Sequence, residues 1–557
     1  MKKIKCLNIL ILIICFIFVG CSSSSSSDNP EKYSQSTGES STEKTIRMSV
    51  SGTPKVDPQV GNNTVDSIAR VNLYDSLVYP TLDGAIEPSL AESWEYDDTN
   101  YSYTFKLRQG VKFHNGEELT SDDVVFSMNR HLAIGEGSAY LFKGVVKEVV
   151  AVDTYTVKFI LEKPYGPFVS TLINLSILCK NEVINNIDSN GAYGEFGDYG
   201  RNWLLTHDAG SGPYVLKELQ QQGYLLATRF EDYWKGWDNK DAPDTIRLID
   251  NTEASTVRTM MGNKELEITD EWQSTENIAA MSKLPGVEIA KLSTGLVQNM
   301  MYNNKKAPTD DENFRRALNC LYDYEMISTN ILVDSPQANG PVSTNTPGAY
   351  QNNAKFKFDI EKAKEYLQKS KYADKLDEYP VELLVNTDVA DHEKIALALQ
   401  ASAQQIGIKV NISKAPWISI QEQVAKVDTT PNVVCISVAP HFMEAGSMLL
   451  SRYHSSSVGT WEQGEWLEND DIDSMIENAL ATVDNNERYK KYEDIQKILV
   501  NEIVPSGWLV DLVQRHAYRS DYVYWPIAEL SKSGEIPTLS VGYAFDCSQI
   551  KVYPERK

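Results

Sequence analysis

Residues 90–130 read LAESWEYDDTNYSYTFKLRQGVKFHNGEELTSDDVVFSMNR and contain the clearest local patterns in the chain. From Tyr101 to Leu107, large apolar side chains alternate with polar ones, which is the period of a β-strand with one buried face. A second alternating run, from Val111 to His114, lies between two glycine-containing turn signals. The segment therefore predicts two neighbouring antiparallel strands.

A helix is predicted directly after these strands. Thr120 is a candidate N-cap with Asp123 three residues later, and acids crowd the first turn, where the helix dipole is positive. Val124 and Met128 belong to the apolar stripe of this helix. His114 lies in the preceding turn-flanked run, so we interpret it as a structural residue and not as a metal ligand.

This ordered string resembles the signature of the family 5 solute-binding proteins of ABC transporters, the oligopeptide- and dipeptide-binding class. A second block, GSGPYVLKELQQQGYLLATRFEDYW at residues 210–234, is similar to another element of that family. A phosphate-binding loop is excluded there, because no Lys-Ser/Thr pair follows and the next predicted element is a strand. The resemblance covers roughly residues 45–520. It implies an α/β fold, a type II periplasmic-binding-protein-like clamp of two lobes with an extra inserted lobe and mixed β-sheets covered by helices.

The resemblance also implies where the chain crosses between lobes. Roughly 510 residues beyond the N-terminal region are too many for one core, so at least two lobes are expected. The predicted parts are a lipoprotein signal peptide at 1–20, a Ser-rich tether at 21–44, lobe I at 45–90, 212–298 and 520–557, an inserted lobe II at 91–211, and lobe III at 299–519.

The N-terminus predicts export and anchoring. Lysines precede an apolar run from Ile9 to Val19, which is shorter than the roughly 20 residues that span a bilayer and so predicts a secretory signal peptide. Gly20 and Cys21 at its end resemble a bacterial lipobox, although Phe18 stands where leucine is usual. The resemblance implies a lipidated Cys21 and a location on the outer face of the cytoplasmic membrane, or on the periplasmic side in a two-membrane cell. The polar segment that follows predicts a flexible tether with a reach on the order of 25 Å.

Composition excludes several classes of partner. With 53 basic and 77 acidic residues the net charge is −24, which opposes binding to nucleic acid or to an anionic membrane surface. Four cysteines lie beyond the tether, at Cys179, Cys320, Cys435 and Cys547, with no paired spacing that would favour zinc or dithiol chemistry. We interpret them as buried thiols, with an undetermined disulfide as the alternative.

Lobe III contains a strand, helix, strand unit at Val381, at about His392 to Ile406, and at Ile408. Such a unit implies a parallel strand pair, and ligands bind beyond the carboxyl ends of parallel strands. Trp417 follows one of these strands, and the loop 438–444 follows the next. We therefore expect ligand contacts in these loops.

In peptide-binding relatives the loop 438–444 usually carries an aromatic residue and an Asp-Pro dipeptide, and the acid can pair with the α-ammonium of the ligand. Here Glu444 lies opposite the acid, and Val438 stands where tryptophan is common. An exposed glutamate at a helix start is the alternative for Glu444, and a turn-forming role is the alternative for Asp57. The other candidate ligand contacts are His441, Phe442, Trp417, Tyr302, Asn303, Trp508, Asp511, Thr53, Val56 and Asp57.

The resemblance implies a monomeric clamp without a cofactor that closes on short peptides and docks on the permease of an importer driven by ATPase subunits. The alternative ligands are a nickel chelate held by a histidine such as His441, a sugar stacked on Trp417 or Trp508, or another small polar solute. A peptide-pheromone receptor that signals without transport is a third class with the same sequence features. A secreted hydrolase has little support, because there is no G-x-S-x-G or H-E-x-x-H motif and the 7 histidines are dispersed.

Overall fold

The computed structural model describes residues 43–61, 63–82 and 84–557. The predicted signal peptide, Cys21 and the tether up to residue 42 lie outside these residues. At the end of the tether the backbone N–H of Lys44 donates to Asp244 Oδ2 at 3.0 Å, so the chain already pairs with lobe I at this point. No helix in the described part of the chain is both long and apolar enough to cross a membrane.

In the description that follows, lobe I means residues 43–90, 212–292 and 514–557, lobe II residues 91–211, and lobe III residues 297–511. Lobe I is built on a four-stranded sheet of order β1-β10-β9-β8. β1 and β10 run parallel and the other neighbours antiparallel, while β11 and β17 form a further antiparallel pair. The strands are β1 (Thr45–Val50), β8 (Tyr214–Gln220), β9 (Tyr224–Arg229), β10 (Thr245–Asp250), β11 (Val287–Leu292) and β17 (Gln514–Arg519), with the short pairs β2 (Val78–Pro80) and β3 (Ile86–Pro88), and β18 (Val523–Tyr524) and β19 (Lys551–Val552). The helices are α1 (Thr64–Leu73), α5 (Ala254–Gly262), α6 (Thr275–Met281) and α15 (Pro526–Lys532).

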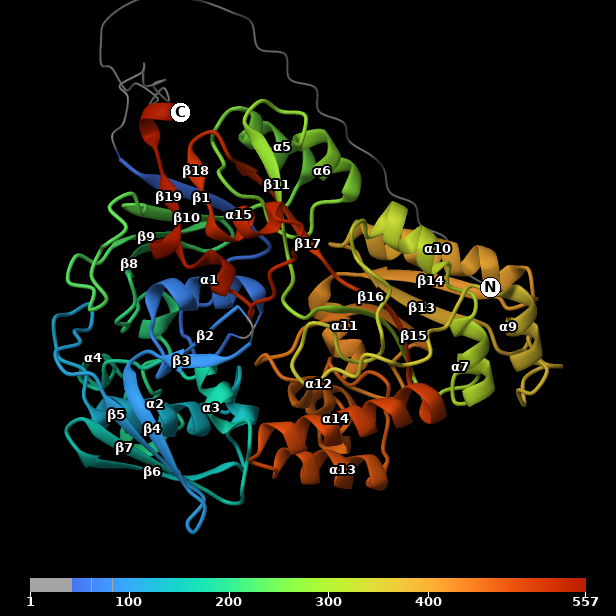
Figure 1. The fold of residues 1–557 in the computed structure, drawn as a ribbon, viewed down its shortest axis with the longest axis horizontal. Helices are drawn as coiled ribbons and strands as arrows, with labels where there is room; N and C mark the ends of the chain where they lie inside the picture. Colours follow the sequence, from blue (N-terminus) through green and yellow to red (C-terminus); the bar gives the residue numbers. More distant parts are fainter. Residues whose placement is uncertain (1–42, 62, 83) are drawn as a thin grey trace, which may run out of the picture. The chain divides into compact units, whose positions relative to one another are not determined.

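Lobe II contains an antiparallel sheet of order β4-β5-β7-β6. Its strands are β4 (Ala91–Asp97), β5 (Ser102–Leu107), β6 (Val146–Asp153) and β7 (Thr156–Leu161), and its helices are α2 (Ser121–Ile134), α3 (Phe168–Thr171) and α4 (Lys180–Asn185). Figure 1 shows this sheet and α2 together in blue and teal at the lower left.

Lobe III is built on a mixed sheet of order β14-β13-β15-β12-β16. β13 runs parallel to both β14 and β15, and β12 runs antiparallel to β15 and β16. The strands are β12 (Val297–Tyr302), β13 (Val381–Asn386), β14 (Val410–Ala415), β15 (Val433–Val438) and β16 (Ser506–Asp511). The helices are α7 (Glu312–Asn319), α8 (Tyr324–Met326), α9 (Ile360–Leu367), α10 (Ala390–Gln404), α11 (Trp417–Val424), α12 (Ala445–Tyr453), α13 (Asp470–Leu480) and α14 (Asn485–Ile498), with π-helical turns at Ile327–Ile331 and Leu499–Ile503.

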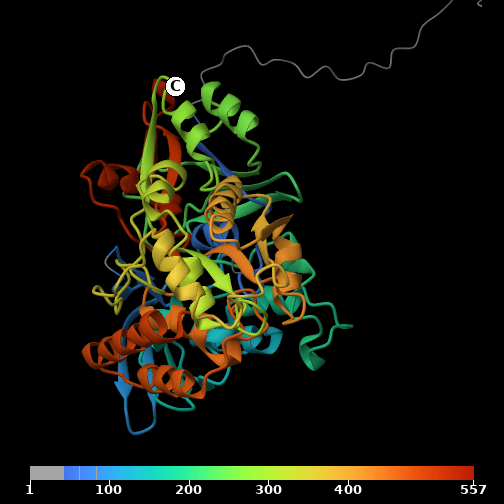
Figure 2. The ribbon, with the colours of Figure 1, turned by 90° about the vertical axis from the view of Figure 1, so that its right-hand side faces the viewer.

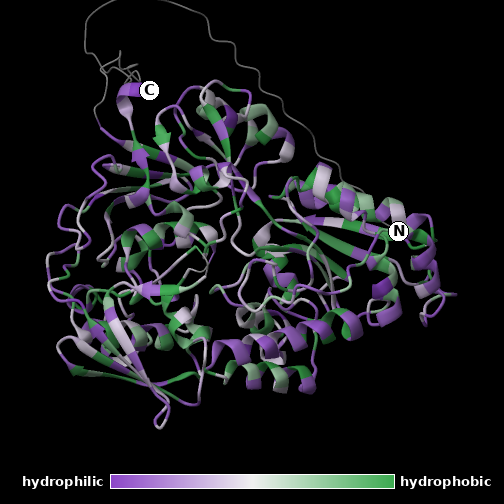
Figure 3. Ribbon diagram, in the orientation of Figure 1, coloured by the Kyte–Doolittle hydropathy of each residue, from purple (hydrophilic) through white to green (hydrophobic). Residues whose placement is uncertain are grey.

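Short 3₁₀ turns connect these elements at Ala139–Leu141, Leu172–Asn174, Gly194–Phe196, Trp203–Leu205, Ser455–Ser457, Tyr543–Phe545, Cys547–Gln549 and Pro554–Arg556. Figure 2 shows α5 and α6, in green, at the opposite end from α13 and α14, in orange and red. In Figure 3, α13 and α14 carry both hydrophilic and hydrophobic segments, as expected of helices with one buried face.

Two connections join lobe I to lobe III, and they run side by side. The first leads from β11 to β12 through residues 293–296, and the second leads from β16 to β17 through residues 512–513. β11 pairs with β17 on the lobe I side, and β12 pairs with β16 on the lobe III side. We call these two connections the hinge, because they are the paired strands along which the two lobes are joined (Figure 1).

The structure confirms the strand predicted from Tyr101 to Leu107, with one difference. Tyr103, Phe105 and Leu107 are at most 4% exposed on β5. Tyr101 does not share this buried face, because it lies in the turn before β5 with φ at 49° and is 39% exposed. The predicted helix is α2, and Thr120 and Asp123 form its capping box.

The prediction of a strand at Val111 to His114 is wrong. β4 and β7 occupy the two edges of β5, so no edge of that strand is left for this run. The run instead folds back on itself, with the Leu119 N–H donating to the Val111 carbonyl at 2.8 Å and a single bridge between Lys112 and Glu118.

The strand, helix, strand unit of lobe III is confirmed as β13, α10 and β14, with the parallel pairing that the pattern predicts. α10 begins at Ala390, two residues before the expected start, so His392 lies in its first turn. The four cysteines beyond the tether are buried free thiols, as interpreted.

Candidate functional site at the hinge

A small cavity, called here the hinge cavity, lies where lobe I, lobe III and the two hinge connections meet. Its volume is about 40 Å³, which accommodates a few water molecules or one small polar group. The lining residues are 271–273 from lobe I, Leu332, Val389, Asp391, His392 and Ser437 from lobe III, and Gln298 and 512–515 from the hinge and its strands. Both lobes therefore form its wall.

Gln298 of β12 organises the lobe III side of the cavity. Its side chain is fully enclosed, and its Nε2 donates to the backbone carbonyls of Ile436 at 3.2 Å and Asn299 at 3.3 Å. These two acceptors orient the amide, so its Oε1 accepts from Ser437 Oγ at 2.7 Å and from His392 Nε2 at 3.1 Å. Gln298 is thereby held in one orientation.

The orientation of Gln298 determines the tautomer of His392. Because Gln298 Oε1 can only accept, His392 Nε2 carries the hydrogen, and Nδ1 of the neutral ring is an acceptor. Burial lowers the pKa of His392 to about 4, so the ring is neutral at pH 7. Nδ1 has no hydrogen-bond partner among the described residues. Lobe III thus contributes an unpaired acceptor to the cavity wall.

Glu271 is the acidic residue on the lobe I side. Burial, together with the nearby charge of Asp270, raises the pKa of Glu271 to about 7. Asp270 is itself held by Ser49 Oγ at 3.0 Å and Gln273 Nε2 at 2.7 Å. No cationic side chain within the described ranges forms an ion pair with Glu271.

Arg515 is the cationic residue of the cavity. It projects from β17 and donates from NH2 to Thr275 Oγ1 at 2.7 Å, and burial lowers its pKa. In the part of the chain that the structure describes, this is its one side-chain hydrogen bond, so further N–H groups of the guanidinium have no protein acceptor.

Direct contacts hold lobe I and lobe III together beside the cavity. Lys394 Nζ of α10 lies 2.8 Å from both carboxylate oxygens of Glu276 in α6 and also pairs with Asp391 at 2.8 Å. Thr275 Oγ1 donates to the Ile331 carbonyl at 2.6 Å. Lobe I and lobe III are therefore in direct contact beside the cavity.

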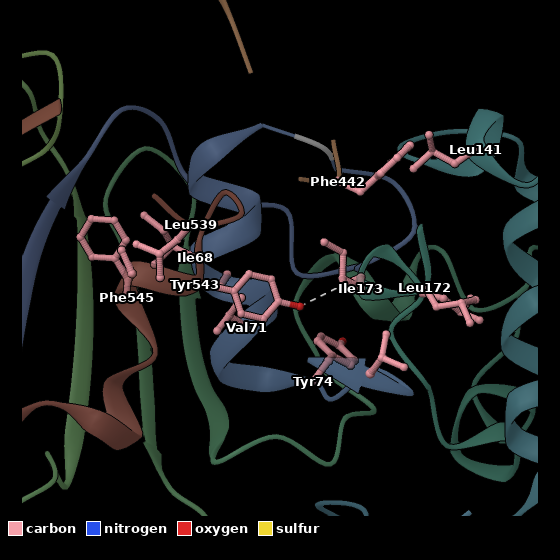
Figure 4. Packing of buried hydrophobic residues seen from close by; sticks show 14 of the residues in the cluster. Ile68, Val71, Tyr74, Leu141, Leu172, Ile173, Phe442, Leu539, Tyr543 and Phe545 are labelled. Carbon is pink, nitrogen blue, oxygen red and sulfur yellow. Dashed lines mark hydrogen bonds between the residues drawn. The ribbon is translucent and has the colours of Figure 1, made fainter. Parts of the chain in front are cut away.

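The loop 438–444 lies elsewhere, against lobe II and the adjoining part of lobe I. Asn174 Nδ2 donates to the His441 carbonyl at 2.8 Å, and Phe442 belongs to the same buried cluster as Leu141 and Ile173. Figure 4 shows Phe442 beside Leu141, and it shows the Tyr543 hydroxyl that donates to the Ile173 carbonyl. The loop is thus an interlobe packing element.

Glu444, predicted as a free anion, is engaged inside the protein. Its two carboxylate oxygens accept from Arg488 Nε at 2.8 Å and NH2 at 2.9 Å, and Oε1 also accepts from the Tyr492 hydroxyl at 2.7 Å. Glu444 is 2% exposed, so the exposed-glutamate alternative is wrong. The ion pair raises the pKa of Arg488. An ammonium-binding role for Glu444 stays a prediction, and it requires the ligand to displace Arg488.

His441 also has an internal partner. Its Nε2 lies 2.8 Å from Glu462 Oε1, and the Tyr140 ring packs edge-on against the imidazole at 5.2 Å. The proximity of His441 lowers the pKa of Glu462 against the opposing effect of burial. Phe442 is fully buried.

The two predicted stacking residues form aromatic contacts within lobe III. Trp417 packs edge-on against Trp461 with ring centroids 5.0 Å apart. Trp508 is 6% exposed and its Nε1 donates to the Tyr453 hydroxyl at 2.9 Å. Neither residue lines the hinge cavity.

Tyr302 and Asn303 belong to the core of lobe III. The Tyr302 hydroxyl donates to Asn319 Oδ1 at 2.8 Å, and Asn303 Nδ2 donates to the carbonyls of Val427 and Thr430 at 3.3 and 3.2 Å. Both side chains are fully buried, so a ligand reaches neither without disrupting the core.

The remaining candidates have structural partners as well. Asp511 Oδ2 accepts from the N–H of Thr344 at 3.0 Å and from its hydroxyl at 2.5 Å. Thr53 Oγ1 donates to Asp250 at 3.0 Å, and the Val56 carbonyl accepts from the Tyr74 hydroxyl at 3.0 Å.

Asp57 is a turn residue, as its alternative reading proposed. Its Oδ1 accepts from the Gln59 N–H at 3.1 Å, and Arg130 of α2 holds both oxygens at 3.0 and 2.6 Å. His114 is likewise structural, since Nδ1 pairs with Asp208 and Nε2 lies 3.0 Å from the Gly212 carbonyl.

Four residues that line the cavity were not predicted from the sequence: Glu271, Gln298, His392 and Arg515. His392 had a usable signal, because it lies in the first turn of the helix after β13, at the strand end where ligands are expected. The other three come from segments far apart in the sequence, and only the pairing of the hinge strands brings them together.

Comparisons with known proteins agree with this architecture. The family model described as bacterial extracellular solute-binding proteins, family 5 Middle, matches residues 85–459. The chain is 28% identical over 455 residues to the probable D,D-dipeptide-binding periplasmic protein DdpA of Escherichia coli, covering 80% of this chain and 84% of that protein.

Solved structures share the fold. The periplasmic binding protein DppA of Helicobacter pylori, in complex with the peptide STSA, matches with a TM-score of 0.78 and 20% identity over 92% of this chain and 98% of that one. NikA of Staphylococcus aureus, in complex with Ni(L-His)2, matches with a TM-score of 0.73 and 18% identity over 92% of this chain and all of that one. These structures are of the type II periplasmic-binding-protein class that the resemblance implied.

Proposed function

Since this chain belongs to the bacterial extracellular solute-binding proteins of family 5, we propose that it captures short peptides between its lobes and delivers them to an ABC importer. The observation that carries the proposal is the hinge cavity, where His392 Nδ1 of lobe III and N–H groups of Arg515 have no partner among the described residues. A group that binds there contacts both lobes at once, so it stabilises the closed arrangement.

The assignment to peptides rests on the relatives. The Escherichia coli protein is named as a D,D-dipeptide-binding protein, and the Helicobacter pylori structure contains a bound peptide. Binding and release are then the whole task of the chain. It acts as a monomer, without a cofactor and without catalysis, and the permease and ATPase subunits of the importer are its partners.

Export and anchoring complete the proposal. The apolar N-terminal run directs secretion, and a lipid on Cys21 keeps the protein at the outer face of the cytoplasmic membrane or on the periplasmic side in a two-membrane cell. The polar segment that follows lets the folded part move to a permease. Signalling by a bound pheromone peptide requires the same clamp, and absence of permease and ATPase genes nearby would favour it.

A second candidate ligand is a metal chelate such as a nickel complex. His392 Nδ1 is an unpaired lone pair on a neutral ring whose other nitrogen is held by Gln298, and this is how proteins orient a metal-binding imidazole. The similar Staphylococcus aureus protein was solved in complex with Ni(L-His)2. Because only one protein side chain would bind the metal, a small-molecule chelator must supply its other ligands. A sugar or another small polar solute remains a further alternative.

Native mass spectrometry of the secreted chain, carrying Cys21→Ser and purified from rich medium without refolding, tests the proposal. A series of peptide masses on the protein supports peptide capture. A single non-peptide mass, or a metal adduct that disappears in His392→Gln, would contradict it and leave the solute-binding role in place.

A further inference from the structure

A second cavity, called here the lobe I cavity, has all of its described lining residues in lobe I and shares none with the hinge cavity. Its volume is about 480 Å³, within the range of about 300–1,000 Å³ that is typical of small-molecule sites. Most of the lining is apolar, and its main side chains are Trp525, Ile527, Leu530, Leu539, Tyr543 and Ile550. All of these except Leu530 are at most 9% exposed, so the core of lobe I fixes the walls.

The charged groups that line the lobe I cavity are all acidic. Asp546 is engaged by the protein, because its Oδ2 accepts from the Tyr79 hydroxyl at 3.0 Å and its Oδ1 accepts from the Ser548 N–H at 3.0 Å. Glu87 is exposed at the edge of the cavity and forms no ion pair with a described residue. Lys235 Nζ lies 4.7 Å from the centroid of the Tyr79 ring, but Lys235 is not a lining residue. The lining therefore disfavours an anion.

We propose that the lobe I cavity is a second ligand site, which binds a small apolar molecule that is neutral or positively charged. Burial of apolar surface against the walls supplies the affinity, and the two carboxylates supply the selectivity against anions. The proposal goes beyond the proposed function, because this site lies within one lobe and requires no ligand between the lobes.

The lobe I cavity is connected to the hinge by backbone hydrogen bonds. The N–H of Leu539 donates to the carbonyl of Ser293 at 3.0 Å, and the N–H of Ser293 donates to the carbonyl of Pro537 at 2.9 Å. Ser293 is the first residue of the connection from β11 to β12. An occupant that packs against Leu539 therefore restrains the residues that hold this connection.

The same segment also contacts lobe II. The Tyr543 hydroxyl donates to the carbonyl of Ile173 at 3.3 Å, and Figure 4 shows this contact with Leu539 and Phe545 on the lobe I side. Because Leu539 and Tyr543 both line the cavity, its occupant contacts residues that are bonded to the hinge and to lobe II. Occupancy should therefore reduce the motion of the hinge.

Three aromatic probes of similar size and different charge test the site: 2-phenylethylamine, 2-phenylethanol and 3-phenylpropionate. Each is titrated at pH 7 into the secreted chain carrying Cys21→Ser, and saturation-transfer NMR measures its binding. We expect the amine and the alcohol to bind with dissociation constants on the order of 1 mM or below, as molecules of this size allow. The propionate should bind at least threefold more weakly than the amine.

Variants assign the binding to this cavity. Glu87→Lys replaces an exposed side chain and should remove the preference for the amine over the propionate. Glu148→Lys, at an exposed glutamate of β6 in lobe II, is the matched control and should leave the preference unchanged. Leu530→Trp adds bulk at a wall residue that is 42% exposed, and it should weaken all three probes at least fivefold.

Hydrogen exchange read by mass spectrometry tests the connection to the hinge. Saturating 2-phenylethanol should slow exchange at least twofold in peptides that contain Ser293 and Leu539, and should leave peptides from β6 unchanged. Probes that do not bind saturably, or that bind equally well to Glu87→Lys and Leu530→Trp, overturn the site. Tighter binding of the propionate overturns the charge assignment, and unchanged exchange at Ser293 in the saturated protein overturns the connection to the hinge.

Discussion

The hinge cavity and the loop 438–444 both lie at ends of strands in the lobe III sheet, yet they differ in how their polar side chains are paired. In the loop, Glu444 pairs with Arg488 and His441 pairs with Glu462. In the cavity, His392 Nδ1 has no hydrogen-bond partner among the described residues, and Glu271 forms no ion pair with any of them. A buried charge that is paired inside the protein supports packing, whereas an unpaired buried acceptor in a cavity is a candidate ligand contact. Position at a strand end is thus insufficient to identify a binding residue.

The largest effect expected from this comparison is on stability. Glu444→Gln leaves Arg488 buried without its counter-charge, and loss of one partner of a buried pair costs about 3 kcal/mol or more. Urea unfolding at pH 7 measures the change, with the exposed Glu487→Gln as the control. Ligand affinity should stay within about twofold if Arg488 is the true partner. Loss of ligand without loss of stability would instead support the predicted ammonium role of Glu444.

The second effect is on acid stability. The pKa of His392 is about 4 in the folded chain, and its ordinary value is 6.5. Between pH 4 and pH 6.5, His392 is therefore protonated in the unfolded chain and neutral in the folded chain. Stability is therefore full above pH 6.5 and falls by about 3 kcal/mol toward pH 4. His392→Gln should remove that part of the loss. His131 and His516 are buried with similarly lowered pKa values and remain in the variant, so a difference curve between the two proteins isolates His392.

The third effect has the opposite pH dependence. The pKa of Glu271 is raised from 4.5 to about 7, so the folded chain keeps a proton that the unfolded chain releases, and stability falls as pH rises from 4.5 through 7. Glu271→Gln should therefore stabilise the ligand-free protein by about 2 kcal/mol at pH 8 and not at pH 4.5. Thermal unfolding at both pH values measures it. If Glu271→Gln changed the stability equally at pH 4.5 and pH 8, the pKa of Glu271 would not be raised by burial.

The smallest effect concerns the interlobe ion pair. Lys394 and Glu276 are partly exposed, so Lys394→Met should weaken ligand binding by less than about 1 kcal/mol, and salt should reduce the difference. Small-angle X-ray scattering of the ligand-free variant is expected to show a more open average. An unchanged affinity at low salt would mean that this pair does not stabilise the closed lobes.

Local patterns predicted much of the fold. The alternation in β5, the capping box of α2 and the order of β13, α10 and β14 all follow from side-chain period and turn chemistry. The prediction failed at residues 111–114, where alternation was present but both edges of β5 were already taken. A strand needs an unpaired sheet edge to bond to as well as an alternating sequence, and the tertiary structure decides whether such an edge is present.

The sequence by itself determined the family, much of the strand and helix order and the polar N-terminal segment, because these depend on neighbours along the chain. Only the tertiary structure decided which polar residues are paired. Gln298, His392, Glu271 and Arg515 come from four distant segments, and Glu444 meets Arg488 across 44 residues. A buried polar group is paired only if a partner atom lies within a few ångströms of it, and the separation of two residues along the sequence does not give their distance in space.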